Sequence, residues 1–315
     1  MRFMLRLSLA ALAVASLTAS GVADRVDSEY RRLEEQLKRI STDDAQLQSA
    51  RNDLNRGAQA AGAEYRLYRL RDAFVSVERL RYFVDHKSAL KSHDTFQDLW
   101  AKERSRFEKR PDNDRGTVLE RALAQSSATR AERLFRASLA YSKATNPTNG
   151  VYYLGEASAN LAFRDFVRGL EGDQTERTPS ASQLASALNS LEAAMLQFFG
   201  EHVGAPDAIP VSARLKEARE LLADGRIEGA TLMAVEAEVV LADRGGPDVS
   251  TATSATPPAG SMSSLLTQWT ATVPAEKKKA RGKAMTFYAS LFSPSKQAVA
   301  TRPQVTVTLV RWPYT

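Results

Sequence analysis

Residues 151–170, VYYLGEASANLAFRDFVRGL, are a predicted helical segment rich in large apolar residues. The large apolar side chains, from Tyr152 to Val167, occupy more than one face of a helix, and Gly172 is placed to end that helix. A helix that is apolar on most sides should be buried between its neighbours. We therefore expect this segment at the centre of a helical protein.

The sequence before this stretch predicts helices that could cover it. Near the start of the chain, apolar residues recur at spacings of three and four, on one helix face: Tyr30, Leu33, Leu37 and Ile40. Residues 41–44 are rich in capping residues. Residues 24–57 are therefore predicted to form either one long helix or two shorter ones broken near Ser41.

Capping patterns mark further helix starts. Thr117 and Glu120 stand three residues apart, as do Asp94 and Gln97, so each pair can satisfy free backbone N–H groups of a first turn. Ser180 precedes another apolar stripe and is predicted to cap it.

Short turns join these predicted helices. The helix that opens at Thr117 is expected to run to Ala144, either unbroken or with a break near Ser127, and residues 146–150 are typical of a turn. Helices joined by short turns pack antiparallel as hairpins. The sequence therefore predicts a mainly α fold of about eight helices over residues 24–243, stacked as a bundle or an α-solenoid.

Residues 214–243 form a hairpin in which small and apolar residues allow the two helices to approach closely: Ala218, Leu221, Gly225, Ile227, Ala230 and Ala237. In this placement the segment resembles about one tetratricopeptide (TPR) repeat. Arg214 and Glu217 depart from the family, which prefers a large apolar residue and a leucine there, and no second copy follows at the family's period. The resemblance implies TPR-like packing and a scaffold for protein partners.

The N-terminal residues 1–23 fit a secretory signal peptide. Arg2 and Arg6 precede an apolar run that is too short to span a membrane. Small residues at the end of the segment suit cleavage after Ala23. We therefore expect an exported protein, periplasmic or secreted.

The C-terminal part changes in composition. Residues 244–262 are rich in Gly, Pro, Ser and Thr, which predicts a flexible linker. In the remaining segment, 263–315, the alternating stretch 304–310 is typical of a strand. We expect this small C-terminal segment to contain β-strands.

Composition excludes several kinds of site. The 315 residues include no cysteine and three histidines, which rules out disulfides, thiolate metal ligands and cysteine nucleophiles. His86 and His93 would share a face only on an unbroken helix, so no metal site is predicted. Nucleotide-binding loops and serine-hydrolase elbows do not occur, and no cofactor is expected. The net charge of +6 falls to +4 without residues 1–23, which is too mild to predict nucleic-acid binding.

Glu156 is the most notable acid, because it lies with Tyr152 and Tyr153 on the predicted central helix. A buried carboxylate needs a partner, and Arg164 or Arg168 on the same helix could supply one. Such a group is either a structural ion pair, which we favour, or a general acid.

Other charged residues also have two interpretations. Residues 65–71, YRLYRLR, interleave tyrosines and arginines as stacking platforms for polyanions do, although a solvated helix face is the simpler interpretation. Glu236 and Glu238 are two residues apart, so we expect them on different helix faces.

The predicted C-terminal segment carries the densest basic run, which comprises Lys277, Lys278, Lys279, Arg281 and Lys283. Beside aromatic residues, this run could contact an anionic membrane surface or form a solubilising turn between strands. Trp312 and Tyr314 near the end could pack into a core or meet a partner.

These features together predict a non-enzymatic binding or scaffold protein of the bacterial cell envelope, with a groove for a protein partner. One alternative is an envelope enzyme or ligand-binding domain that uses buried carboxylates. Another is weak attachment to a membrane surface or polyanion through the basic C-terminal segment.

Overall fold

The computed structural model describes residues 2–40, 45–107, 115–142, 147–170, 172, 178–202, 204, 206–245, 262 and 265. Within these residues the chain is mainly helical and contains no strand, as the sequence predicts for residues 24–243. The predicted C-terminal strand lies outside the described residues.

The α-helices of the described part are α1 (Arg2–Arg39), α2 (Ala45–Ala58), α3 (Ala63–Asp85), α4 (His93–Glu103), α5 (Val118–Ser142), α6 (Thr148–Arg168), α7 (Ala181–Phe199), α8 (Ile209–Ala223) and α9 (Ile227–Asp243). Three short 3₁₀ turns accompany them: η1 (Lys87–Leu90), η2 (Arg104–Phe107) and η3 (Gly200–His202). In the region of residues 24–57, the prediction of two shorter helices is the one confirmed.

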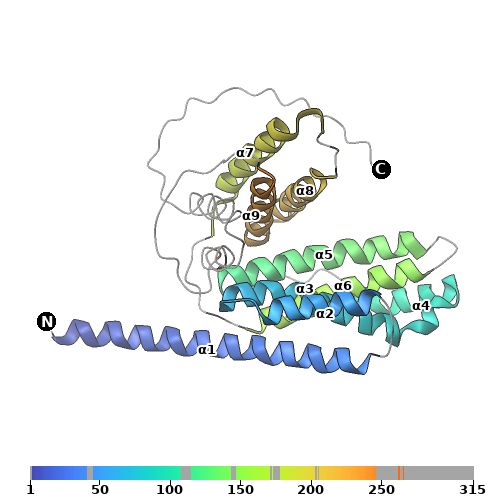
Figure 1. Ribbon diagram of the computed structural model, residues 1–315, viewed down its shortest axis with the longest axis horizontal. Helices are drawn as coiled ribbons and strands as arrows, with labels where there is room; N and C mark the ends of the chain where they lie inside the picture. The colour runs from blue at the N-terminus through green and yellow to red at the C-terminus, as the bar shows by residue number, and fades with distance from the viewer. Residues whose placement is uncertain are drawn as a thin grey trace.

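The helices form a bundle in which neighbours along the chain pack as pairs (Figure 1): α2 with α3, α5 with α6 and α8 with α9. The predicted central helix is α6, and it packs against both α5 and α3. Its residues Leu154, Phe163 and Val167 are fully buried, which confirms that it lies between neighbours.

The last three helices, α7, α8 and α9, form a second group that contacts the first mainly where α9 meets α5. One apolar core runs through both groups. Met262 and Leu265 are buried in that same core, although the sequence assigns Met262 to the end of a linker. A smaller aromatic cluster joins α4 to the bundle, with the Trp100 ring stacked 4.6 Å from the Phe135 ring.

Two predicted helix starts are confirmed in atomic detail. The Thr117 backbone N–H donates to Glu120 Oε2 over 2.9 Å, and the Glu120 N–H donates to Thr117 Oγ1 over 3.1 Å. Ser180 and Gln183 exchange the same two bonds at the start of α7. Each pair satisfies N–H groups that the first helical turn leaves without partners.

The predicted start at Asp94 is wrong by two residues. Ser92 is the cap, because its extended backbone lets Ser92 Oγ accept from the Thr95 N–H, while Thr95 Oγ1 accepts from the Ser92 N–H. Asp94 instead stands in the first turn, where the helix dipole favours a negative charge. His86 and His93 are separated by η1, so they do not share a helix.

The helix α5 passes Ser127 without a break, which confirms the unbroken alternative. Two further boundaries differ from the prediction. The expected turn at residues 146–150 is shorter, because Pro147 suits a helix start and α6 begins directly after it. Gly169 rather than Gly172 caps the end of α6, and its N–H bonds to the Asp165 carbonyl over 3.2 Å.

Glycines allow two close helix contacts. A Cβ atom added to Gly155 on α6 would lie 3.1 Å from a ring carbon of Tyr82 on α3. A Cβ on Gly229 of α9 would lie 3.0 Å from Gln125 Cβ and 3.3 Å from the Ser126 backbone nitrogen of α5. These separations are tighter than ordinary contacts, so both helix pairs depend on the missing side chain.

Candidate functional site

Glu156 on α6 is an ion-paired carboxylate. Its Oε2 lies 3.2 Å from the Arg79 guanidinium of α3, and its Oε1 lies 3.1 Å from that of Arg130 on α5. The expected partners on the same helix are wrong. Arg164 pairs with the adjacent Asp165 at 2.7 Å, and eight residues along a helix separate it from Glu156 by about 12 Å of axial rise.

Tyr152 and Tyr153 are engaged with other aromatic rings. The Tyr152 ring stacks 4.2 Å from that of Phe83, and the Tyr153 ring stacks 4.3 Å from that of Tyr141. Glu156 and these two tyrosines line neither of the two cavities considered below. All three side chains therefore join neighbouring segments of the bundle rather than face either cavity.

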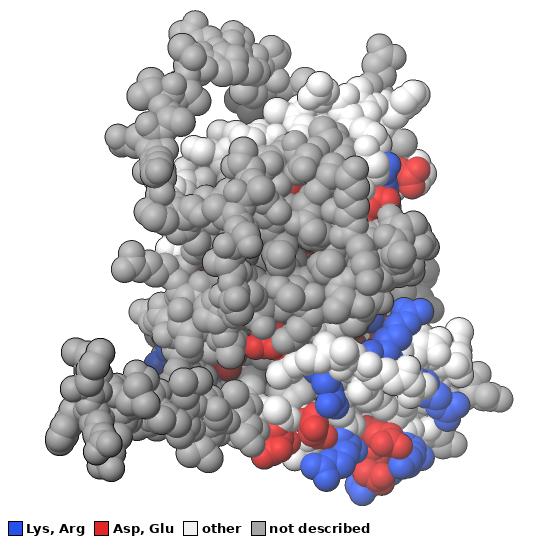
Figure 2. Space-filling view, turned by 60° about the vertical axis from the view of Figure 1, so that its left-hand side comes forward, with Lys and Arg blue, Asp and Glu red and all other residues white. Residues whose placement is uncertain are grey.

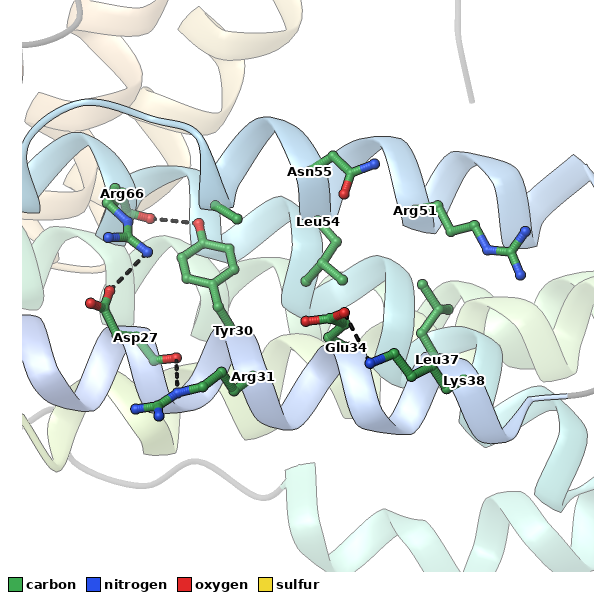
Figure 3. A pocket seen from close by; sticks show the side chains of 11 residues that line it. Asp27, Tyr30, Arg31, Glu34, Leu37, Lys38, Arg51, Leu54, Asn55 and Arg66 are labelled. Atoms are coloured by element: carbon green, nitrogen blue, oxygen red, sulfur yellow. Dashed lines mark hydrogen bonds and ion pairs between the residues drawn. The ribbon is translucent and has the colours of Figure 1, made fainter.

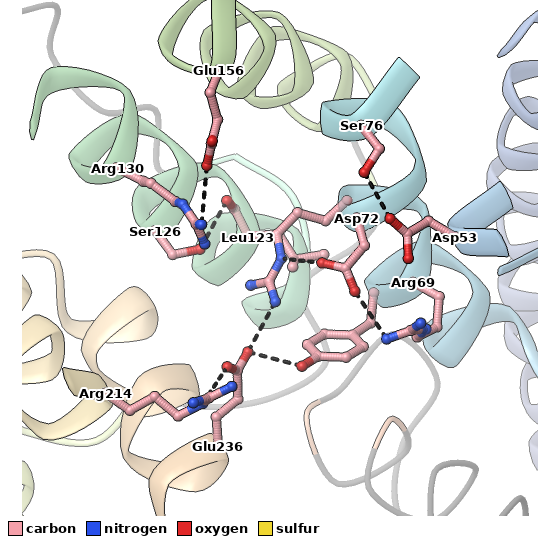
Figure 4. Close-up of polar contacts among 12 residues, drawn as sticks. Asp53, Arg69, Asp72, Ser76, Leu123, Ser126, Arg130, Glu156, Arg214 and Glu236 are labelled. Atoms are coloured by element: carbon pink, nitrogen blue, oxygen red, sulfur yellow. Dashed lines mark hydrogen bonds and ion pairs between the residues drawn. The ribbon is translucent and has the colours of Figure 1, made fainter. Parts of the chain in front are cut away.

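The first cavity, of about 590 Å³, lies among α3, α5, α6, α8 and α9. Five arginines from three helices line it: Arg69, Arg71, Arg130, Arg133 and Arg214. Figure 4 shows Arg130 and Arg214 reaching into the same space from α5 and α8. We call it the arginine cavity.

Glu236 of α9 anchors one wall of the arginine cavity. Its carboxylate lies 3.3 Å from Arg71 and 3.2 Å from Arg214, and it accepts a 3.0 Å hydrogen bond from the Tyr68 hydroxyl. Burial by itself would raise the pKa of Glu236. The charges of Arg71 and Arg214 and the hydrogen bonds to the carboxylate outweigh burial and lower that pKa below its usual value.

The interpretation of residues 65–71 as a solvated face is therefore wrong for part of the segment. The Tyr68 side chain is buried, and the Arg71 side chain is only 14% exposed. Burial raises the pKa of the Tyr68 hydroxyl, and the charge of Glu236 raises it further, so this group stays protonated and donates its hydrogen bond.

The accessible wall of the arginine cavity is cationic. The side chains of Arg130, Arg133 and Arg214 are 48%, 43% and 34% exposed. Their nearest carboxylate partners are less exposed, at 18% for Glu156, 13% for Glu217 and 5% for Glu236. Arg133 also lies 3.6 Å from Glu220, which is 39% exposed. Asp72 also lines the cavity and is 37% exposed, so solvent meets three guanidinium groups and one carboxylate, and positive charge is in excess.

The second cavity is a groove of about 730 Å³ between α1 and α2, bounded also by Arg66 of α3 (Figure 3). Tyr30, Leu37 and Leu54 give it an apolar floor, since each is part of the main core. The Tyr30 hydroxyl donates to the Arg66 carbonyl over 2.9 Å, which fixes the ring. We call it the α1–α2 groove.

Charged residues form the rim of the α1–α2 groove. Asp27 pairs with Arg66 at 2.8 Å, and Glu34 pairs with Lys38 at 3.0 Å. Within the described residues, Arg31 and Arg51 have no carboxylate at ion-pair distance, so the rim has an excess of positive charge. Figure 2 shows charges of both signs intermingled on the lower part of the molecule, at the level of α1.

The remaining predicted site residues lie outside the described part of the chain. These are Lys277, Lys278, Lys279, Arg281, Trp312 and Tyr314. Among the described residues, no helix is both long enough and apolar enough to cross a membrane. No group of acidic and histidine side chains in that part could hold a metal ion.

Comparison of the chain with protein-family models, with curated proteins and with solved structures finds no match.

Proposed function

We propose that the protein is an exported, non-enzymatic binding protein of the bacterial cell envelope, and that the α1–α2 groove receives a segment of a partner protein. The observation that carries the proposal is the groove itself. It combines a floor of Tyr30, Leu37 and Leu54 with a charged rim along one side of the bundle. Protein interfaces share this anatomy of an apolar centre and a polar rim.

The dimensions of the groove favour one face of a short helix as the occupant. Its lining runs from Asp27 to Lys38 on α1, which corresponds to about 16 Å of axial rise, or about three helical turns. A cavity of about 730 Å³ is too small to enclose a whole helix of that length. It can accept the apolar stripe of an amphipathic helix, as in helix-in-groove recognition.

The charge on the rim favours an acidic partner. Arg31 and Arg51 lack carboxylate partners among the described residues, so a Glu or Asp flanking the apolar stripe of the bound helix can pair with them. Charge complementarity of this kind selects partners and speeds association. We therefore propose an acidic amphipathic helix as the bound segment.

The state of Glu156 and Glu236 supports a role for these two carboxylates without catalysis. Both oxygens of Glu156 are paired with arginines, and Glu236 has two arginine partners and a tyrosine donor. A general acid needs a proton near neutral pH, whereas the lowered pKa of Glu236 keeps it ionised there.

Site-directed photo-crosslinking tests the groove. A photoreactive phenylalanine derivative replaces Asn55, which lines the groove, and in a matched control it replaces Lys91, an exposed residue outside it. In cells that export the protein, we expect a crosslinked partner from Asn55 and none from Lys91. The substitution Arg51→Glu should reduce that crosslink at least fivefold, and Lys91→Glu should leave it unchanged.

Equal crosslinking from the two positions would refute the groove as the binding site.

Export is checked separately, by cell fractionation and by sequencing the N-terminus of the purified protein. We expect Asp24 as the first residue. A cytoplasmic protein that starts at Met1 would refute export without bearing on the groove.

A further inference from the structure

The arginine cavity has properties that the proposed protein-binding function does not use. It is a separate cavity from the α1–α2 groove, because the residues that line the two are all different. Its volume of about 590 Å³ lies within the usual range for small-ligand sites, about 300–1,000 Å³.

The cationic groups come from separate helices and keep hydrogen-bonding capacity. A guanidinium has five N–H donors, and each carboxylate partner in this cavity uses only one or two of them. Arg130 and Arg133 extend from α5, and Arg214 extends from α8. An anion between these helices can therefore accept hydrogen bonds without displacing their present partners.

The cavity also offers neutral polar groups. Ser126, Ser127 and Asn160 line it. Ser127 is 1% exposed, and its Oγ has no hydrogen-bond partner among the described residues. A buried hydroxyl without a partner costs stability, and a ligand that bonds to it would remove that cost.

We propose that the arginine cavity binds a small polar molecule that carries a phosphoryl group. A phosphoryl dianion presents three oxygens, so it can accept from guanidiniums on both sides of the cavity, whereas a single carboxylate has only two. Its double charge also competes better for Arg130 and Arg133, which already face Glu156 and Glu217. The cavity is larger than a phosphate ion, which leaves room for an organic part beside Ser127 and Asn160.

The test is calorimetric titration of the full-length protein with glycerol phosphate, and with glycerol, inorganic phosphate and sulfate as comparison ligands at equal ionic strength. We expect glycerol phosphate to bind at least tenfold more tightly than sulfate, and glycerol not to bind. The substitutions Arg130→Gln and Arg133→Gln should each weaken glycerol phosphate binding by about tenfold, since each removes a charge-assisted hydrogen bond.

A matched control keeps loss of folding apart from loss of binding. Arg81→Gln removes an arginine of similar exposure, 49%, from α3 outside the cavity, and it should leave binding unchanged. The helical circular dichroism signal of each variant is recorded first. Ser127→Ala, the smallest change, should weaken glycerol phosphate more than inorganic phosphate, because its hydroxyl faces the organic part.

Two results would overturn the proposal. One is equal affinity for sulfate and glycerol phosphate that neither cavity substitution changes, which indicates an adventitious ion only. The other is no binding of glycerol phosphate by the folded wild-type protein. Neither result bears on the α1–α2 groove, which is tested with other residues.

Discussion

Replacing Glu236 with glutamine should strongly destabilise the protein, because it neutralises a buried charge between two arginines. Glu236 is 4% exposed and lies 3.3 Å from Arg71, whose side chain is only 14% exposed. The next carboxylate, Asp72, is 3.7 Å from Arg71 and more exposed. Arg71 would therefore lose its main compensating charge.

The magnitude follows from the distances. Two unit charges 3.3 Å apart attract each other by about 5 kcal/mol at an effective dielectric constant of about 20. Removing one partner of a buried pair costs about 3–5 kcal/mol. Because glutamine can still accept the hydrogen bond from Tyr68, we expect the lower value, about 3 kcal/mol. This corresponds to a fall in Tm of about 6–12 °C.

Urea denaturation at pH 7, followed by circular dichroism, measures this difference. The matched control is Glu192→Gln, which removes an exposed ion pair with Arg219 and should cost less than about 1 kcal/mol. The pH dependence gives a second readout. Since the pKa of Glu236 is lowered in the folded state, its contribution is present above the unfolded pKa, about 4.5, and is lost as the pH falls through the folded pKa.

The stability difference between the wild type and Glu236→Gln should therefore shrink as the pH falls below about 4.5. A cost below about 1 kcal/mol at pH 7, or a difference that does not change on acidification, would show that Glu236 does not hold the two helix groups together electrostatically.

Three other substitutions test separate parts of the fold. The pKa of Glu120 is raised by burial, despite hydrogen bonds from two backbone N–H groups, so its stability contribution falls as the pH rises through the folded pKa. In urea denaturation, the stability difference between the wild type and Glu120→Gln should therefore shrink as the pH rises, whereas the difference for Glu236→Gln should shrink as the pH falls. A Glu120→Gln difference that shrinks as the pH falls would contradict this. Gly229→Val should lower the free energy of unfolding by about 1–3 kcal/mol, because the added side chain overpacks against Gln125. Urea denaturation measures this, and an unchanged midpoint would contradict the close α5–α9 contact. Ser180→Ala should lower the stability by about 1 kcal/mol through loss of its cap, whereas Ser182→Ala, two residues later in the first turn, should have a smaller effect in the same urea titration.

Most of the helical fold could be predicted from the sequence because it depends on local patterns. The spacing of apolar residues on α6 indicates its burial, and the Thr117–Glu120 pair and Ser180 mark two helix starts. The predicted start of α4 was wrong because two capping residues compete there. Ser92 and Asp94 can both begin a helix, and only the backbone conformation of Ser92 decides between them.

The polar sites could not be predicted in the same way, because their partners are distant in the sequence. Glu236 pairs with Arg71, 165 residues earlier, and Glu156 pairs with Arg79 and Arg130 on two other helices. Periodicity shows which face of a helix is apolar, but it does not show which helices become neighbours. The interleaved tyrosines and arginines of residues 65–71 were the one available signal for the arginine cavity.

The uninterrupted course of α1 through Ala23 has a consequence for the proposed export. In the full chain, Asp24 and Asp27 stand in the middle of a helix, where they gain nothing from its dipole. Cleavage after Ala23 would place both carboxylates in the first turn of a shortened α1, where the helix dipole favours negative charge, while Asp27 keeps its 2.8 Å ion pair with Arg66. Arg25 already donates to the carbonyl of Gly169 at the end of α6, so the cut end would be held against the negative pole of the central helix. Removal of the leader would thus leave a helix whose new terminal ammonium group stands beside two carboxylates.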